Sequence, residues 1–402
     1  MHNIFDILIC GAGPSGLVSA LTFAKQGYKV AIIDPNKRDS ETIGLTDNKF
    51  PDFRSTAHLN PTVEFLKTLG IWDEICANSC PLEELILIED QYERPFFSAK
   101  KKIVFRSSEV GQSCFGYNLP IKDSLFGLSK LVKANKNITC FFGLALQDIL
   151  QKDHLISGKL SDGSTIDSKL IIGADGSGSK VREALGIGVQ FRNTRQTALS
   201  FHITHDKPHY NSSTEIYSEG GPFTVVPLTQ KNGLNASAVV WMQTTEEAQF
   251  LLDCVDDVFR EYVQKKSLGV VGNIRSCSPV SSREIVIQIA NNIVAKRAVL
   301  IGEAAHLLPP IGAQGYNSSI KDIMILSQLI GECALDPGES SILRKYKSIR
   351  MPDLYIKTGG VGLLNFLAWT NNPLIKKARL LGLNLIDSNE LIKKSAIRFG
   401  LN

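Results

Sequence analysis

Residues 5–34 read FDILICGAGPSGLVSALTFAKQGYKVAIID, and this stretch decides the fold. The apolar run Phe5–Cys10 is typical of a buried parallel strand, Pro14–Gln26 of a helix, and Lys29–Ile33 of a second strand. Together they predict a βαβ unit, which is the building block of an α/β fold with a parallel sheet.

Three glycines at G-x-G-x-x-G spacing form the first loop, Gly11–Gly16. Gly11 permits a tight turn, Gly13 lets the backbone approach a pyrophosphate, and Gly16 lets the helix pack closely on the strand. The helix N-terminus then presents free N–H groups to the phosphates. Asp34 ends the second strand, where a carboxylate suits the hydroxyl pair of a ribose. The pattern predicts a dinucleotide site, and the alternative is a glycine-rich turn in another kind of α/β protein.

Length and composition fit a globular protein. The chain has 402 residues, which suggests two or three domains, with 43% hydrophobic and 21% charged residues. It has no uninterrupted apolar run of about 18 residues, so a transmembrane helix is not expected. The first residues lack the charged region and cleavage site of a secretory signal, so we expect a cytoplasmic protein. Eight scattered cysteines without a C-x-x-C pair indicate reduced thiols and no metal site.

The net charge of +4 is unevenly distributed. Residues 343–402 contain eleven Lys or Arg and three Asp or Glu, a balance of +8, so the remainder carries −4. Nucleic acid is a poor explanation, because no aromatic-interleaved basic motif accompanies the charge. A helix on the inner, anionic face of a membrane is favoured, since basic residues accompany the apolar run Gly362–Trp369. The basic residues concerned are Lys376, Lys377, Arg379, Lys393, Lys394 and Arg398. The alternative is that these helices only cover the rest of the protein with a solvated basic face.

Further along the chain, the patterns predict two kinds of sheet. Continuous apolar runs such as Ile138–Phe142 and Lys169–Gly173 resemble the first strand, whereas residues 197–242 alternate short strands with turns, as in an antiparallel sheet. Residues 36–57 are polar and predict a loop. A capping box at Thr244 predicts one helix to about Lys265. Its expected apolar side comprises Phe250, Leu251, Cys254, Val255, Val258, Phe259 and Tyr262.

Two more loops each follow a buried strand and lead into a helix. The second loop, Gly173–Arg182, contains Asp175, whose carboxylate can accept hydrogen bonds from backbone N–H groups or from a ribityl hydroxyl. Its glycines, including Gly176, admit a cofactor against the backbone. The third loop, Gly302–Asn317, is rich in glycine and proline, and its following helix again points free N–H groups at a ligand.

The three loops together resemble the signature of the class A flavoprotein aromatic hydroxylases, which share the fold of para-hydroxybenzoate hydroxylase. Residues 52–59, here called the arginine segment because they carry Arg54, resemble the ubiquinone-biosynthesis branch of that family. The run Leu69–Trp72 does so too, as does Gly221-Pro222 leading to Val226–Leu228. The resemblance covers about residues 4–350 and is specific for FAD.

The resemblance implies an α/β fold: a Rossmann-like FAD-binding domain with an inserted antiparallel-sheet substrate domain and a helical C-terminus. The expected FAD-binding parts are residues 1–75, 111–185 and 291–345, the substrate-domain parts are 76–110 and 186–290, and the C-terminal helical segment is 346–402. No second Rossmann fingerprint appears, so NAD(P)H binding transiently, or a separate reductase, would supply the electrons.

The resemblance also implies roles by position. The ADP half of FAD would be held by Gly11, Gly13, Gly16 and Asp34. Arg54 would reach the flavin ring and the pyrophosphate. The ribityl chain and the pyrophosphate would be lined by Asp175, Gly176 and Glu303. The catalytic residues would be Arg54, Pro310 and Gly312, of which Pro310 and Gly312 would lie beside the isoalloxazine ring. Backbone N–H groups from Gly312 through Gln314, Gly315 and Asn317 would stabilise negative charge on this ring.

One position, and one group of positions in the third loop, depart from the family pattern. Glu303 stands where the family usually has Asp, which moves the carboxylate by about 1.5 Å, one carbon–carbon bond. The third loop keeps Pro310, Gln314, Gly315 and Asn317 but places Pro309, Gly312, Ala313 and Ser319 at the other four signature positions. These departures concern the substrate more than the cofactor.

Other conspicuous residues have simpler interpretations. His202 and His205 would point to opposite faces of a strand, so with His209 they predict no metal site. His306 is expected to orient its loop rather than to act as a base.

The sequence therefore predicts an FAD-dependent monooxygenase that hydroxylates the aromatic ring of a polyprenylated ubiquinone precursor through a flavin C4a-hydroperoxide. Its expected partners are a lipophilic phenolic substrate, O₂ and other ubiquinone-biosynthesis proteins. One alternative is another phenolic substrate on the same fold. The other is a non-catalytic flavoprotein that scaffolds a biosynthetic complex.

Overall fold

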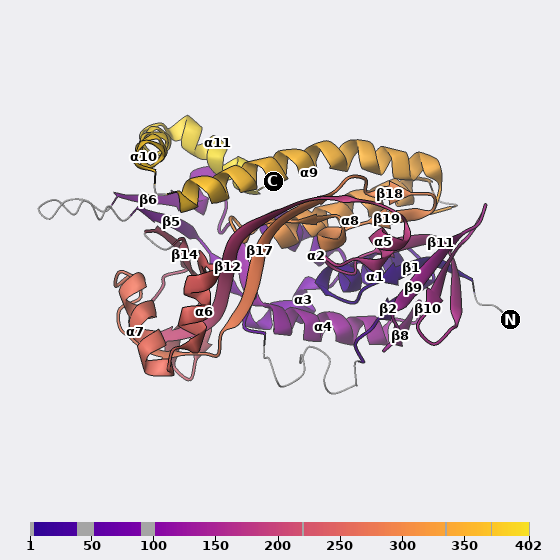
Figure 1. Cartoon of the computed structure of the whole chain (residues 1–402), viewed down its shortest axis with the longest axis horizontal. Coiled ribbons are helices and arrows are strands. Elements are labelled where there is room, and N and C mark those ends of the chain that lie inside the picture. Colours follow the sequence, from indigo (N-terminus) through magenta and orange to yellow (C-terminus); the bar gives the residue numbers. More distant parts are fainter. Residues whose placement is uncertain are drawn as a thin grey trace, which may run out of the picture.

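The computed structural model describes residues 4–37, 52–89, 101–218, 221–333, 336–370 and 372–401. Two large sheets lie side by side, and a long helix, α9 (Ser340–Trp369), runs along both (Figure 1). The boundary expected between residues 345 and 346 falls inside this helix, so the C-terminal segment continues directly from the first part of the fold.

The first sheet has the strand order β18-β19-β11-β1-β2-β8, and its central strands β19, β11, β1, β2 and β8 are parallel. Two further strands extend it: β10 pairs antiparallel with β11, and β9 pairs antiparallel with β10. The bounds are β1 (Phe5–Cys10), β2 (Val30–Asp34), β8 (Ile138–Phe142), β9 (Leu146–Gln151), β10 (Ile156–Leu160), β11 (Thr165–Gly173), β18 (Val294–Ala295) and β19 (Ala298–Leu300). The predicted βαβ unit is confirmed.

Helices cover this sheet and complete its core. The helix after β1, α1 (Pro14–Lys25), packs against both α4 (Ile121–Ala134) and α8 (Gln314–Cys333), and a short helix, α5 (Lys180–Ala184), follows the second loop. Ile7, Leu8 and Ile9 of β1 are 0% exposed, as the continuous apolar run requires for a strand covered on both faces.

The second sheet has nine strands in the order β20-β17-β12-β15-β14-β13-β5-β6, with β16 paired to β12. All its pairs are antiparallel except β13 with β5. The bounds are β5 (Glu84–Glu89), β6 (Lys101–Arg106), β12 (Val189–His205), β13 (Ser212–Tyr217), β14 (Phe223–Lys231), β15 (Leu234–Thr244), β16 (Ile274–Cys277), β17 (Ser281–Ala290) and β20 (His306–Leu307).

Alternate residues of β12 face opposite sides of this sheet. Leu199, Phe201 and Ile203 form a core with the helices α6 (Thr245–Asp253) and α7 (Asp256–Lys266) on one side. Ala198 packs on the other side, against the third loop and α9. The second side is therefore the one turned toward the first part of the fold.

The prediction of a single helix after Thr244 is wrong. Cys254 and Val255 are extended, with ψ of 145° and 153°, so the chain breaks into α6 and α7. The break resets the helical phase, because each residue of a helix turns by a fixed angle. Two residues expected on the apolar side, Val255 and Val258, are consequently 69% and 40% exposed, while Val263 is buried.

A small sheet and several short helices join the two large sheets. The small sheet contains β3 (Ser55–Leu59), β4 (Cys80–Leu82) and β7 (Gly116–Pro120). The prediction of a polar loop over residues 36–57 is wrong from Ser55 onward, because β3 begins there and pairs with β7. Residues 38–51 of the predicted loop lie outside the described residues. The helical elements here are α2 (Asn60–Thr68), α3 (Trp72–Ile75), η1 (Cys76–Asn78) and η2 (Ser107–Val110).

The last two helices, α10 (Pro373–Ser388) and α11 (Glu390–Leu401), lie over β5 and β6. Leu383 and Ile386 of α10 and Ile397 of α11 pack on Phe105 of β6. Part of each helix therefore covers the second sheet.

Candidate cofactor and active site

The three loops predicted from the sequence meet at the carboxyl ends of β1, β11 and β19. A methyl group on Gly11 would lie 2.4 Å from the carbonyl oxygen of Ala174, and one on Gly302 would lie 3.2 Å from Oγ of Ser15. Segments far apart in the chain thus form one continuous edge, which is where parallel sheets bind ligands.

The first loop has the space that a pyrophosphate needs. Gly11 has φ of +103°, and a methyl group on Gly16 would lie 1.9 Å from the oxygen of Gly11, so both positions require glycine. A methyl group on Gly13, in contrast, would meet no heavy atom of the described residues within 4 Å. Among the described residues, no side chain caps the N-terminus of α1 above this space. The open space and uncapped N–H groups fit the phosphates of FAD.

Asp34 lies at the end of β2 and is 6% exposed. Its Oδ2 accepts a hydrogen bond from the backbone N–H of Ala12 at 2.8 Å, and its Oδ1 accepts one from Asn36 N at 2.9 Å. The carboxylate therefore fixes the first loop against β2, and its contact with a ribose remains a prediction.

The second loop uses its acid to start a helix. Asp175 Oδ2 accepts a hydrogen bond from the backbone N–H of Val181 at 3.0 Å. Of the two roles considered for this carboxylate, the structure thus shows the acceptance of a hydrogen bond from the backbone. Burial raises the pKa of Asp175. Gly176 has φ of +80°, which favours glycine. Arg182, which the sequence did not single out, donates to the carbonyl of Ala304 at 2.8 Å and so joins the second loop to the third.

The third loop is open where the flavin ring was expected. Pro310 and Gly312 are exposed, and Gly312 and Ala313 have φ of +62° and +57° immediately before α8. A methyl group on Gly315 would meet no described heavy atom within 4 Å. The backbone of this turn is therefore accessible to a planar ring.

The side chains at the start of α8 are engaged elsewhere. Asn317 donates through Nδ2 to Ala57 O at 2.8 Å and accepts through Oδ1 from Leu59 N at 2.9 Å, which ties the third loop to the arginine segment. Gln314 donates to Gly400 O at 2.9 Å. At Gln314 and Asn317 it is therefore the backbone N–H groups, and not the side chains, that suit the stabilisation of negative charge on a flavin ring.

Arg54 is held by a neighbour within its own segment. Its Nε and Nη2 contact the carboxylate of Asp52 at 2.8 and 2.6 Å, and its side chain is 39% exposed. The hydrogen bond to Asp52 raises the pKa of Arg54, and Glu303 adds to this. The charge of Arg54 is therefore influenced by an acid of the third loop.

Glu303 reaches the second sheet through a salt bridge to Arg283 of β17, with distances of 2.7 and 3.1 Å. Burial opposes ionisation of Asp52, but hydrogen bonds from Arg54 and the charge of Arg283 lower its pKa overall. We call Asp52, Arg54, Arg283 and Glu303 the charge bridge, since they form two ion pairs, Asp52 with Arg54 and Arg283 with Glu303, whose charges influence one another. The longer side chain at position 303 thus has a visible partner. No motif or spacing in the sequence marks Arg283.

A buried network supports the third loop from behind. Asp322 accepts hydrogen bonds from His306 Nε2 at 2.8 Å, from the N–H of Gly302 at 2.9 Å and from Arg350 Nε at 2.7 Å. Burial would raise the pKa of Asp322, but the charge of Arg350 and the hydrogen bond from His306 lower it. This arrangement supports an orienting role for His306. Arg350, 0% exposed, lies on the apolar stripe of α9 with Tyr346 and Leu354, a mismatch that could have marked it in the sequence.

Of the other histidines, His205 and His209 are neighbours whose ring centroids lie 6.4 Å apart, and each contacts a different group. His205 Nε2 is 2.9 Å from Ser237 Oγ, and His209 Nε2 is 3.0 Å from Leu228 O. His202, on the opposite side of β12, packs its ring 5.5 Å from that of Phe53, and burial lowers its pKa to about 4. Burial likewise lowers the pKa of His58 to about 4. Both are neutral at pH 7.

An apolar cluster lies between the second sheet, the third loop and α9. It contains Ala198, Met242, Ile285, Leu308, Ile311 and Val361, with Val240 and Trp369 packed on it. Ile311 lies between Pro310 and Gly312, so the cluster borders the predicted position of the flavin ring. We call this group the ring cluster.

Comparisons with known proteins agree with this arrangement. The family model described as "FAD binding domain" matches residues 5–353. Ubiquinone hydroxylase UbiL of Rhodospirillum rubrum is 27% identical over 404 residues, covering 99% of this chain and 90% of that protein. The 3-demethoxyubiquinol 3-hydroxylase of Escherichia coli is 26% identical and covers 98% of both. Among solved structures, p-nitrophenol 4-monooxygenase PnpA from Pseudomonas putida DLL-E4 aligns over 100% of this chain and 99% of its own, with a TM-score of 0.79 and 16% identity, which confirms the predicted fold.

Proposed function

This chain belongs to the FAD-binding-domain family and is an FAD-dependent monooxygenase, and we propose that it hydroxylates the aromatic ring of a polyprenylated ubiquinone precursor. The observation that carries the proposal is the ring cluster, a buried apolar cluster beside the exposed turn at Pro310 and Gly312. Its aliphatic side chains suit a lipophilic ring better than a charged one. The full-length similarity to two hydroxylases of ubiquinone biosynthesis supports this choice of substrate class.

The chain's own residues would bind, orient and shield the reactants. Bound FAD, once reduced by NAD(P)H or a reductase, supplies the activation of O₂. The first loop would bind the pyrophosphate at the N-terminus of α1. Backbone N–H groups at the start of α8 would stabilise negative charge on the ring, and Arg54 would add a fixed positive charge. The ring cluster would keep water away from the reacting atoms.

A direct test uses purified protein loaded with FAD, a short-chain polyprenyl phenol and ¹⁸O₂. We expect one ¹⁸O atom in the ring of the product, detected by mass spectrometry. Hydroxylation of a small phenol without the prenyl chain, at an equal or greater rate, would favour the alternative phenolic substrate. Bound FAD that neither reduces nor reacts with O₂ would favour the scaffold.

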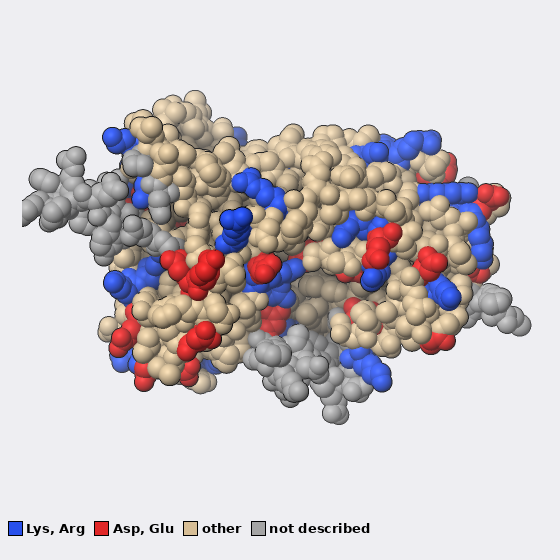
Figure 2. Space-filling model, viewed as in Figure 1, with Lys and Arg blue, Asp and Glu red and all other residues tan. Residues whose placement is uncertain are grey.

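We also propose that the C-terminal helices bind a membrane surface, where such a substrate resides. None of the helices in the described part of the chain is long and apolar enough to cross a bilayer. Leu374, Leu381 and Leu385 of α10 are 75%, 69% and 58% exposed, and Leu391 and Phe399 of α11 are 77% and 72% exposed. Figure 2 shows a largely uncharged surface where Figure 1 places α10 and α11. Leucine and phenylalanine gathered in this way mark an interaction surface.

The basic residues contribute less to this surface than the sequence indicated. Three of the six are held in ion pairs with glutamates: Arg379 with Glu89, Lys393 with Glu109, and Lys394 with Glu390. The helices thus cover the second sheet with one face and expose apolar side chains on the other. We therefore expect apolar contacts to contribute most of the binding, with a smaller contribution from anionic lipid.

Flotation with vesicles tests this contact. The wild-type protein is expected to float with phosphatidylcholine vesicles containing phosphatidylglycerol, and the double variant Leu381→Glu/Leu385→Glu is expected to lose most of that binding. Each leucine withdrawn from the lipid costs about 1.5–3 kcal/mol of burial. Leu234→Glu, an exposed leucine of β15, is the matched control and should float normally. Negligible wild-type binding to charged and neutral vesicles would contradict direct docking and leave another ubiquinone-biosynthesis protein as the route to the substrate.

A further inference from the structure

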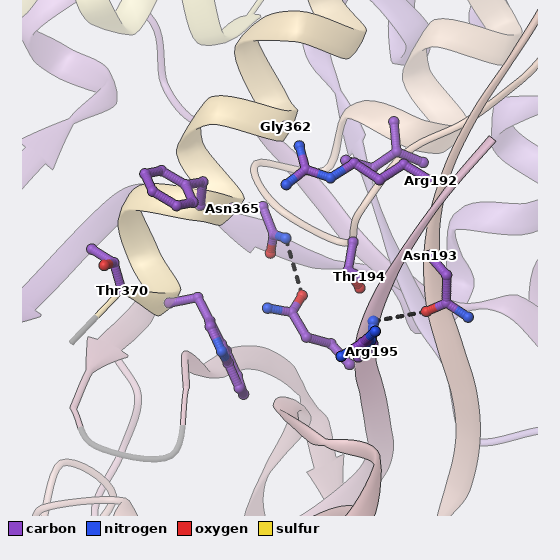
Figure 3. A pocket seen from close by; sticks show the side chains of 11 residues that line it. Arg192, Asn193, Thr194, Arg195, Gly362, Asn365 and Thr370 are labelled. Carbon is purple, nitrogen blue, oxygen red and sulfur yellow. Dashed lines mark hydrogen bonds between the residues drawn. The ribbon is translucent and has the colours of Figure 1, made fainter. Parts of the chain in front are cut away.

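A cavity of about 410 Å³ lies between β12 and the last turns of α9, next to the ring cluster. Figure 3 shows residues of β12 on one side of it and residues of α9 on the other. Arg192 and Arg195 belong to the β12 wall, and Asn365, Phe366 and Trp369 belong to the α9 wall. Trp369 also packs on the ring cluster, so the cavity adjoins the proposed active site.

Asn365, which lines this cavity, carries a buried polar atom without a partner among the described residues. It is 5% exposed, and its Nδ2 donates to Oε1 of Gln196 at 3.0 Å, the contact drawn in Figure 3. Its Oδ1 is buried and has no hydrogen-bond partner among the described residues. A buried carbonyl oxygen without a donor is costly, so this position suits a ligand that supplies an N–H or O–H group.

The backbone of β12 is shaped so that two arginines share the cavity. Residues three apart in a regular strand point to opposite faces, yet Arg192 and Arg195 both line this space. The register of β12 with β17 shifts between Asn193 and Gln196, and Arg195 has φ of +56°. This β-bulge brings the second arginine to the side of the first.

Neither arginine has a carboxylate of its own. Both are exposed, and no salt bridge within 4.0 Å joins either to an acid in the part of the chain that the structure describes. Two guanidinium groups beside aromatic rings suit an aromatic ligand with phosphates, because the planar forks bind phosphate oxygens in pairs. Phe366, 48% exposed, offers a ring face at the cavity edge.

We propose that this cavity binds a nicotinamide dinucleotide through its phosphates and one of its rings. Arg192 and Arg195 hold the phosphates, Phe366 or Trp369 contacts a ring, and an amide or amino N–H of the ligand donates to Asn365 Oδ1. This inference rests on the proposed function, since a flavin monooxygenase consumes an electron donor. A neutral polyprenyl phenol would use neither arginine, and the sequence has a single G-x-G-x-x-G loop, which we assign to FAD.

The test measures binding without turnover. NADP⁺ and NAD⁺ are titrated by calorimetry into the FAD-loaded protein, with inorganic pyrophosphate as a competitor. We expect one of the two nucleotides to bind, pyrophosphate to displace it, and Arg192→Gln to weaken it at least tenfold. Arg344→Gln is the matched control, because Arg344 is an exposed arginine at the opposite end of α9 whose side chain contacts Ser340. Its affinity should equal that of the wild type.

Three outcomes would overturn the inference. One is equal nucleotide affinity in the wild type and Arg192→Gln. Another is the absence of nucleotide binding at millimolar concentration. The third is tight binding of 4-hydroxybenzoate that depends on Arg192 while nucleotides do not bind, which would make the cavity a site for an acidic phenol. Hydroxylation by protein reduced with dithionite separates the two proposals, since this reduction needs no nucleotide. If this protein hydroxylates the phenol but binds no nucleotide, only the cavity assignment fails. If it does not hydroxylate the phenol, the proposed function fails.

Discussion

Replacing Gly13 with valine is expected to give a folded protein that does not bind FAD. Gly13 has φ of −66° and ψ of 179°, which valine adopts without strain, and a methyl group there meets no described atom within 4 Å. The added side chain would fill only the space assigned to the pyrophosphate. The wild type should be yellow, with one FAD per chain, and the variant colourless with an unchanged circular dichroism spectrum.

Two other glycines serve as controls for this experiment. Gly382→Val adds the same side chain in open space on α10, and this variant should keep its FAD. Gly16→Val should instead lose the fold, since a methyl group would lie 1.9 Å from the oxygen of Gly11. Full FAD occupancy in Gly13→Val would contradict the cofactor site described above.

Arg54→Ala is expected to keep the fold and FAD but to lose hydroxylation by roughly 10²-fold, the effect of removing one preorganised charged donor. The fold should tolerate the change because the side chain is 39% exposed and Asp52 retains the nearby charge of Arg283. The measurement is kcat and KM with a polyprenyl phenol, together with bound FAD per chain. Arg54→Lys should recover only part of the rate, because an ammonium group lacks the planar fork.

The matched control for Arg54 lies on the second sheet. Arg275 contacts Asp206 through Nε and Nη2 at 2.6 and 2.9 Å, the same kind of pair at an exposed position of β16. Arg275→Ala should leave the rate unchanged. An unaltered rate in Arg54→Ala would refute the role given to this arginine and leave it as part of the charge bridge alone.

The features predictable from the sequence were those encoded within one short stretch. The first loop and its strands were predicted because glycine spacing and continuous apolar runs report local geometry directly. The break between α6 and α7 was missed, because the apolar pattern runs through Cys254 and Val255 without a glycine or proline to mark it. The long β12, 17 residues, was predicted only over its apolar part.

Contacts between distant segments could not be predicted in the same way. Glu303 pairs with Arg283, 20 residues earlier, and Asp322 pairs with Arg350, 28 residues later. Nothing in the spacing of these charges reports that they meet, since tertiary packing places them. The cavity on β12 was missed for the same reason, because a β-bulge rather than an alternating pattern brings Arg192 and Arg195 together.

The strand order of the first sheet has a consequence for biosynthesis. β11 pairs on one side with β1 and on the other with β19, and Ile171 lies opposite Ala298 although about 130 residues separate them. α8, which packs on α1, is made later still. The ribosome must therefore synthesise nearly the whole second sheet before the core of the first sheet can be completed. Until then, the N-terminal strands remain partly unpaired and expose apolar side chains. A fragment ending before β19 would be a substrate for chaperones or proteases rather than a smaller cofactor-binding protein.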